Sequence, residues 1–206
     1  MNQHKHPHRN ISLAISTCLI ALCGACSPPA PLPQGMDSVV YRPQKSKPVD
    51  SATTLKPGQR APGFSLPSVS GGQISLSQFR GKRHVVLSFV PAAFTPVCSS
   101  QYPGYNIALD LFEKNDAVLL GITSDNIPSL HAWEVSMGGL DFDLLSDFWP
   151  HGKVASQYGI LRSDGTSERA LIVIDKQGVI RYVDVHDINK RPKLEDLAKV
   201  LNELNP

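Results

Sequence analysis

The sequence feature that most constrains the fold is a short apolar run that leads into a turn containing proline and threonine. Residues 85–90 read Val-Val-Leu-Ser-Phe-Val, a β-branched run bounded by polar residues, which predicts a buried strand. Pro96 stands where a helix can begin, so we expect Thr95 to be the N-cap and Cys98 to be the third helical residue. A thiol there lies at the positive end of the helix dipole, which favours a reactive thiolate.

Strands and helices are predicted to alternate through the rest of the chain, which ends with a hairpin and a helix. In the helix after Cys98, the spacing of Ile107, Leu111 and Phe112 predicts one apolar face, and Pro103 predicts a kink in the early turns. This order predicts an α/β sandwich with a mixed central sheet flanked by helices. The expected strands are 73–76, 85–90, 117–122, 142–145, 170–174 and 179–183, and the expected helices are 77–81, 96–115, 127–138, 153–158 and 194–204.

Composition narrows the class of function. A chain of 206 residues with 41% hydrophobic residues suits one domain plus a tail. The net charge is +2 and no run of Lys and Arg resembles a nucleic-acid-binding patch, so we expect no nucleic-acid partner. The histidines at 84, 131, 151 and 186 lack metal-ligand spacing, and we expect neither a metal nor another cofactor.

The amino end reads as a secretory signal peptide over residues 1–25. Residues 1–10 carry Lys5 and Arg9 but no acidic residue, and residues 11–25 are apolar or small and uncharged. This run is short for a membrane span, although a single anchoring helix is an alternative. Residues 22–27 resemble a bacterial lipobox, with small residues before Cys26 but with Cys23 where an aliphatic residue is usual.

We therefore expect an exported protein that is lipid-anchored through Cys26 to a bacterial membrane, in the periplasm or at the cell surface. Two acyl chains there would give stable anchoring. A soluble secreted product, cut between residues 25 and 30, is the main competitor. Residues 26–56 are rich in Pro, Ser and Lys and lack apolar periodicity, which predicts a disordered tether before a domain over 57–206.

Three motifs carry a resemblance to a known family. The spacing Pro91-x-x-x-Thr95-x-x-Cys98 is the first, and the segments 168–175 and 178–182 are the others. On these motifs, residues 58–187 resemble a peroxiredoxin of the alkyl hydroperoxide reductase/thiol-specific antioxidant family. The resemblance implies a thioredoxin-like fold and a thiol-dependent peroxidase acting on H2O2 or an organic hydroperoxide. Dimers are common in that family, which makes a homodimer a candidate assembly.

The resemblance also implies roles for the motif residues. Cys98 would be the peroxidatic nucleophile, Thr95 would help to orient the peroxide, and Pro91 would shield the thiolate from water. Each residue also has a simpler interpretation. A lone cysteine is often just a small buried hydrophobe, Thr95 can serve only as a helix cap, and Pro91 can simply end the strand.

Arg169 is the expected active-site arginine, because it stands just before the predicted strand 170–174, where the family carries that residue. A guanidinium near Cys98 would favour the thiolate and donate hydrogen bonds to the peroxide. We prefer it to Arg162, which lies in a loop-like Ser/Asp/Gly stretch. Gln101 is expected either to make a supporting polar contact or to be an exposed residue of the first turn.

The other three cysteines, at positions 18, 23 and 26, all lie within the first 26 residues, which leaves the predicted domain with Cys98 alone. Pro103 occupies the position where some relatives carry a resolving cysteine. The domain therefore resembles the one-Cys type, in which an external thiol, either thioredoxin-like or of low molecular weight, reduces the sulfenic acid.

Three other classes of function compete with the peroxidase. A thioredoxin-like disulfide reductase needs a second cysteine at the position of Gln101, and a copper chaperone of similar fold needs one at the position of Tyr102. A non-catalytic lipoprotein that serves as an interaction module on the same scaffold is the alternative hypothesis. The motif set of Pro91, Thr95, Cys98 and Arg169 argues against it.

Overall fold

A five-stranded mixed sheet forms the centre of the computed structural model, which describes residues 31–204. The strand order is β5-β4-β3-β6-β7, in which β3 (His84–Phe89), β4 (Ala117–Thr123) and β5 (Asp143–Ser146) are parallel. The strands β6 (Arg169–Ile174) and β7 (Ile180–His186) form the predicted antiparallel hairpin. The predicted mixed sheet is confirmed.

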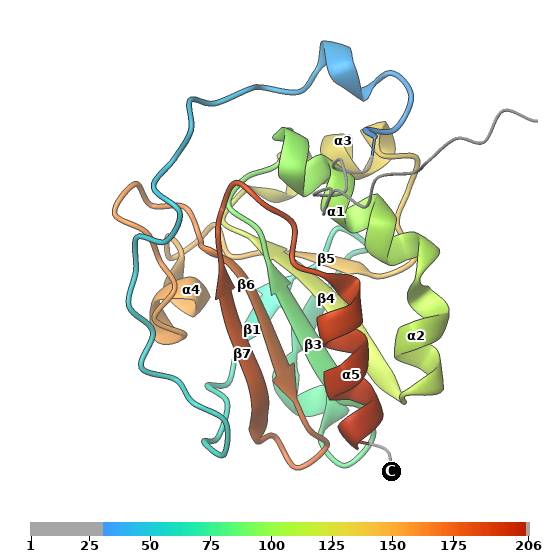
Figure 1. Ribbon diagram of the computed structural model, residues 1–206, viewed down its shortest axis with the longest axis vertical. Helices are drawn as coiled ribbons and strands as arrows, with labels where there is room; N and C mark the ends of the chain where they lie inside the picture. The colour runs from blue at the N-terminus through green and yellow to red at the C-terminus, as the bar shows by residue number, and fades with distance from the viewer. Residues whose placement is uncertain (1–30, 205–206) are drawn as a thin grey trace, which may run out of the picture.

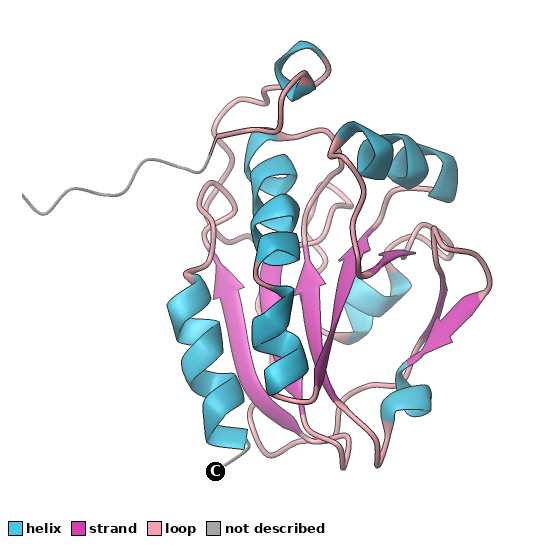
Figure 2. Cartoon of the chain, turned by 90° about the vertical axis from the view of Figure 1, so that its right-hand side faces the viewer, coloured by secondary structure: helices cyan, strands magenta, loops and turns pink. Residues whose placement is uncertain are grey.

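Helices cover both faces of this sheet. The helices α1 (Pro96–Ile107), α2 (Leu109–Lys114) and α5 (Leu194–Leu204) lie on one face, and α4 (Lys153–Gln157) lies on the other (Figures 1 and 2). The helix α3 (Ile127–Ser136) packs beyond the carboxyl ends of β3 and β4 (Figure 1). The remaining elements are the hairpin of β1 (Ser65–Pro67) with β2 (Gln73–Ser75) and two short 3-10 helices, η1 (Met36–Ser38) and η2 (Leu76–Phe79).

The central strand β3 is buried along its whole length, as its apolar composition requires of a strand that is covered on both faces. Val86 points into the apolar cluster beneath α1 and α5, which also contains Cys98. Its neighbours Val85 and Leu87 point into the second cluster, with Val154 of α4. The strand therefore connects both cores and holds the start of α1 in a fixed position.

The long helix after Cys98 is divided differently from the prediction. Pro103 lies inside α1, and the chain leaves helical geometry at Ala108, where φ is −101° and ψ is 20°. We attribute the continuation through Pro103 to the burial of Tyr102 and Tyr105 on either side, because packing offsets the missing backbone bond. The break turns Ile107 outward to 89% exposure, so the expectation that it shares a buried face with Phe112 is wrong.

Residues 31–56 lie against the domain, although their composition predicts a disordered tether. They cross one end of the domain and run down its side (Figure 1), and Met36 of η1 is fully buried. The predicted signal peptide, Cys26 and residues 27–30 lie outside the described residues. Within 31–204, no helix has both the length and the apolar character needed to cross a membrane.

Candidate active site

The loop between β3 and α1 positions the thiol as the sequence predicts. Thr95 has extended backbone geometry and precedes α1, so its N-cap position is confirmed. Its hydroxyl does not cap the helix but donates to the carbonyl of Ala92 at 2.9 Å. Phe94 has a φ of 53°, in the left-handed region, and the N–H of Ala93 donates to the Asp125 carboxylate at 2.8 Å. These contacts hold the loop in a strained conformation.

Arg169 and Cys98 meet in the interior of the protein. Cys98 is fully buried in the first turn of α1, and Arg169, the first residue of β6, is 1% exposed. The guanidinium Nη2 lies 3.3 Å from Cys98 Sγ, in hydrogen-bonding contact. A guanidinium at this distance can donate a hydrogen bond to the sulfur and has further donors in the same plane.

The guanidinium of Arg169 is fixed on its other sides. Its Nη1 donates to Gln101 Oε1 at 2.7 Å, while Nε and Nη2 donate to the carbonyl of Ile188 at 3.2 and 3.1 Å. Gln101 is fully buried and also donates from Nε2 to Ser88 Oγ at 3.2 Å, so it makes the polar contact expected of a supporting residue and is not exposed on the first turn. The carbonyl of Ile188 has no side-chain signature, and sequence reasoning missed it.

Apolar and aromatic side chains surround the thiol. Pro91 is buried at the start of the loop, as a shielding role requires. Trp133 of α3 is fully buried and donates from Nε1 to Ser99 Oγ at 2.9 Å. Burial raises the pKa of Tyr102, whose hydroxyl donates to the carbonyl of Ser88 at 2.8 Å. These groups keep water away from Cys98, which strengthens its contact with Arg169.

Two further arginines lie outside the contact with Cys98. Arg162 is buried but pairs with Glu168 at 2.6 Å, so it does not contact the thiol. Arg191, which sequence reasoning missed, is half-buried and packs against Gly104 of α1. Burial lowers the pKa of Arg191, the Tyr105 hydroxyl opposes that shift, and the charge of Arg169 adds to it. A second guanidinium therefore packs against α1, the helix that carries Cys98.

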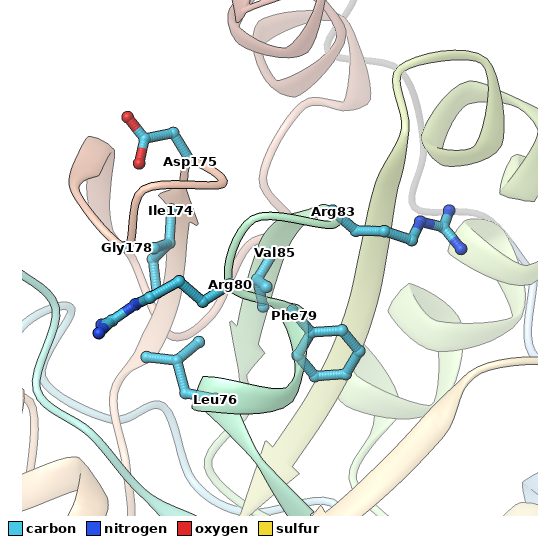
Figure 3. A pocket seen from close by; sticks show the side chains of 8 residues that line it. All are labelled: Leu76, Phe79, Arg80, Arg83, Val85, Ile174, Asp175 and Gly178. Carbon is cyan, nitrogen blue, oxygen red and sulfur yellow. The ribbon is translucent and has the colours of Figure 1, made fainter.

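Cys98 lies apart from a small hollow at the other end of the sheet. This hollow, lined by Leu76, Arg80, Val85 and Ile174, lies at the opposite end of β3 and β6 from Cys98 (Figure 3). It contains no thiol. Among residues 31–204, no three His, Cys, Asp or Glu side chains gather closely enough to hold a metal ion.

Comparison with known proteins agrees with this geometry. Residues 57–183 match the family model of the AhpC/TSA family. Alkyl hydroperoxide reductase E of Mycobacterium tuberculosis is 35% identical over 132 residues, covering 64% of this chain and 86% of that protein. Peroxiredoxin TSA1 of Saccharomyces cerevisiae is 34% identical over 140 residues, covering 63% of this chain and 70% of that protein.

A solved structure extends the match to three dimensions. The reduced 2-Cys peroxiredoxin of Plasmodium vivax superposes with a TM-score of 0.66 at 30% identity, covering 70% of this chain and 79% of that one. This chain therefore has the peroxiredoxin version of the thioredoxin-like fold, as expected from the sequence. The chain belongs to the AhpC/TSA family of peroxiredoxins and is a thiol-dependent peroxidase.

Proposed function

We propose that this protein reduces H2O2 or an organic hydroperoxide through Cys98 and is recycled by an external thiol, as a peroxiredoxin of the one-Cys type. The observation that carries the proposal is the buried contact of 3.3 Å between Cys98 Sγ and Arg169 Nη2, at the N-terminus of α1. A cation and a helix N-terminus act together on one sulfur there.

In the first half of the reaction, the Cys98 thiolate attacks one peroxide oxygen and the O–O bond breaks. Sulfur is oxidised to the sulfenic acid, and the other oxygen leaves as water or an alcohol after it gains a proton. Arg169 and Thr95 are proposed to stabilise the charge that develops on the departing oxygen. Pro91 and Trp133 limit the access of water to this step.

In the second half, an external thiol attacks the sulfenic sulfur, which gives a mixed disulfide and water. A second thiol then releases Cys98 and leaves as part of a disulfide. The sequence supports this route, because Cys98 is the only cysteine after Cys26. The name of the mycobacterial relative supports an alkyl hydroperoxide as one of the substrates to be compared.

Steady-state turnover with matched cysteine variants tests this proposal. Peroxide consumption with glutathione or thioredoxin as the reductant should be lost in Cys98→Ser and kept in Cys26→Ser, which removes a cysteine outside the domain. After one equivalent of peroxide without reductant, a sulfenic-acid reagent such as dimedone should label Cys98. Turnover by Cys98→Ser, or a Cys98–Cys98 disulfide in place of the label, contradicts the one-Cys mechanism.

The non-catalytic alternative is not favoured, because the chain has kept the whole motif set together with the buried partners of Arg169. It would gain support if Cys98→Ser left every cellular phenotype intact.

We further propose that the protein is exported and lipid-anchored through Cys26, on the basis of the residue pattern at 11–27. Cells supplied with a labelled fatty acid should incorporate the label into the wild-type protein and not into Cys26→Ser. Equal labelling of both proteins contradicts the assignment to Cys26.

A further inference from the structure

A segment that precedes the family's matched region is held against the active site by a dense set of hydrogen bonds. We define residues 41–51 as the N-terminal strap; the family match begins only at residue 57. At the start of the strap, the N–H of Tyr41 donates to the carbonyl of Phe94 at 2.8 Å. Phe94 is the residue with left-handed geometry in the loop before Cys98. One end of the strap thus contacts the loop that carries Thr95.

The other end of the strap contacts the turn that follows β7. The N–H of Ile188 donates to the carbonyl of Pro48 at 2.9 Å. The next residue, Asn189, accepts from the N–H of Ser46 at 3.3 Å and donates from Nδ2 to the carbonyl of Ser46 at 2.9 Å. Both backbone groups of Ser46 are therefore paired with one side chain, which fixes the strap relative to this turn.

A buried carboxylate fixes the strap a second time. Glu168, fully buried, accepts at Oε1 from the N–H groups of Asp50 and Ser51, at 2.6 and 2.7 Å. Its other oxygen accepts from Arg162 at 2.6 Å, and Arg162 also donates to the carbonyl of Lys47 at 3.1 Å. A buried carboxylate needs partners on both oxygens, and the strap supplies those for Oε1.

These contacts lead directly to the reacting sulfur. Pro48 accepts from Ile188, the carbonyl of Ile188 accepts twice from Arg169, and Arg169 contacts Cys98. The strap thus holds Ile188 in place, and Ile188 in turn holds the guanidinium of Arg169. We propose that the strap is a positioning element for the peroxidase reaction, which orients Arg169 by holding the carbonyl of Ile188 in place.

This inference rests on the proposed function, and variants of the full chain test it. Asn189→Ala removes both hydrogen bonds between the Asn189 side chain and the backbone of Ser46. Asp50→Ala removes the carboxylate that accepts from the N–H and hydroxyl of Ser163 at 2.9 and 2.6 Å, contacts that do not involve Arg169 itself. Two exposed residues serve as controls: Lys190→Ala alters the same turn as Asn189, and Lys82→Ala alters the turn before β3, at the end of that strand opposite to Cys98.

Two rate constants are measured for each variant, one with H2O2 and one with iodoacetamide, at a pH where both have reached their plateau. Alkylation requires the thiolate but does not require Arg169 to stabilise a leaving oxygen. Asn189→Ala and Asp50→Ala, the two strap variants, should therefore react about tenfold more slowly with H2O2 and at an unchanged rate with iodoacetamide. A tenfold loss lies within the ~100-fold that a 1 Å misplacement can cost. The two controls should match the wild type in both rates.

The outcomes separate the two proposals. A wild-type chain that reacts with H2O2 no faster than a free thiol overturns the proposed function and this inference with it. A fast wild type with strap variants equal to Lys190→Ala overturns the inference alone. Proportional loss of both rates, or loss that tracks a lower melting temperature, also overturns it, because such loss indicates general damage to the fold.

Discussion

At the scale of single residues, Arg169 contacts a side-chain amide, a backbone carbonyl and the candidate nucleophile at once. Its guanidinium reaches Gln101, the carbonyl of Ile188 and the Cys98 sulfur from one fixed position. An ammonium group on a flexible chain cannot make this set of contacts, because its donors do not form a planar fork.

Arg169→Lys should therefore lower the rate constant for H2O2 by about 10²-fold, at the lower end of the loss expected for an oxyanion donor, ~10²–10³. Stopped-flow measurement under single-turnover conditions gives this value. Arg181→Lys is the matched control, because Arg181 is a half-exposed residue of β7 that pairs with Asp175 at 2.6 Å. If Arg169→Lys and Arg181→Lys react with H2O2 at the same rate, the role assigned to the planar guanidinium of Arg169 is contradicted.

Gln101 is expected to act through Arg169. In Gln101→Met the shape is kept and the acceptor for Nη1 is lost, so the peroxide rate should fall about tenfold, the lower end of the ~1.5–3 kcal/mol assigned to a hydrogen bond with a charged group. Gln78→Met changes an exposed glutamine of η2 and should leave the rate unchanged. An unchanged rate in Gln101→Met contradicts the supporting role.

At the scale of elements, the strand-to-helix unit was predictable because its signals are local. The β-branched run of β3 and the Thr95-Pro96 pair each indicate one conformation with little help from the rest of the chain. The break at Ala108 has no such signal, because neither neighbour is a proline or glycine and the burial of Tyr102 and Tyr105 carries the helix past Pro103. Tertiary packing decides that boundary.

The helix α3 offers a prediction at this scale. Asn126 caps it by accepting from the N–H of Ser129 at 3.0 Å, and the helix carries the buried Trp133 that bonds Ser99 of α1. Asn126→Ala should lower the free energy of unfolding by about 1 kcal/mol, whereas Asn126→Ser keeps a capping oxygen and should cost less. Urea unfolding measures both, and equal losses contradict the cap.

At the scale of the whole molecule, the site depends on contacts between distant parts of the chain. Cys98 and Arg169 are 71 positions apart and meet because β6 pairs with β3. The sequence predicted these two residues and Gln101 through motifs. It did not predict Ile188, Arg191 or the strap, because backbone carbonyls and loop-to-loop contacts leave no periodic pattern in the residues.

The pH dependence of the free energy of unfolding tests the turn at Asp187 and Asn189, which contacts the strap. Hydrogen bonds from the side chain and backbone N–H of Asn189, aided by Lys190, lower the pKa of Asp187 to about 2 from its ordinary 3.8. A carboxyl with a lowered pKa stabilises the folded state fully above 3.8, and this contribution is lost as the pH falls through about 2.

Asp187→Ala should therefore be less stable than the wild type at pH 7, by less than about 1 kcal/mol, because the carboxylate is partly exposed and solvent screens its contacts. The gap between the two should close on acidification from pH 4 towards pH 2. Chemical unfolding across this range measures the gap, and a gap that stays constant down to pH 2 contradicts the charged contacts.

The most direct test of the central claim is the single-turnover reaction of the reduced full-length chain with H2O2 and with an organic hydroperoxide, followed by stopped flow beside Cys98→Ser. The account predicts rapid oxidation that requires Cys98 and far exceeds the rate of a free thiol, and the faster peroxide identifies the substrate class. A rate no better than that of a free thiol, or one that survives Cys98→Ser, would contradict it.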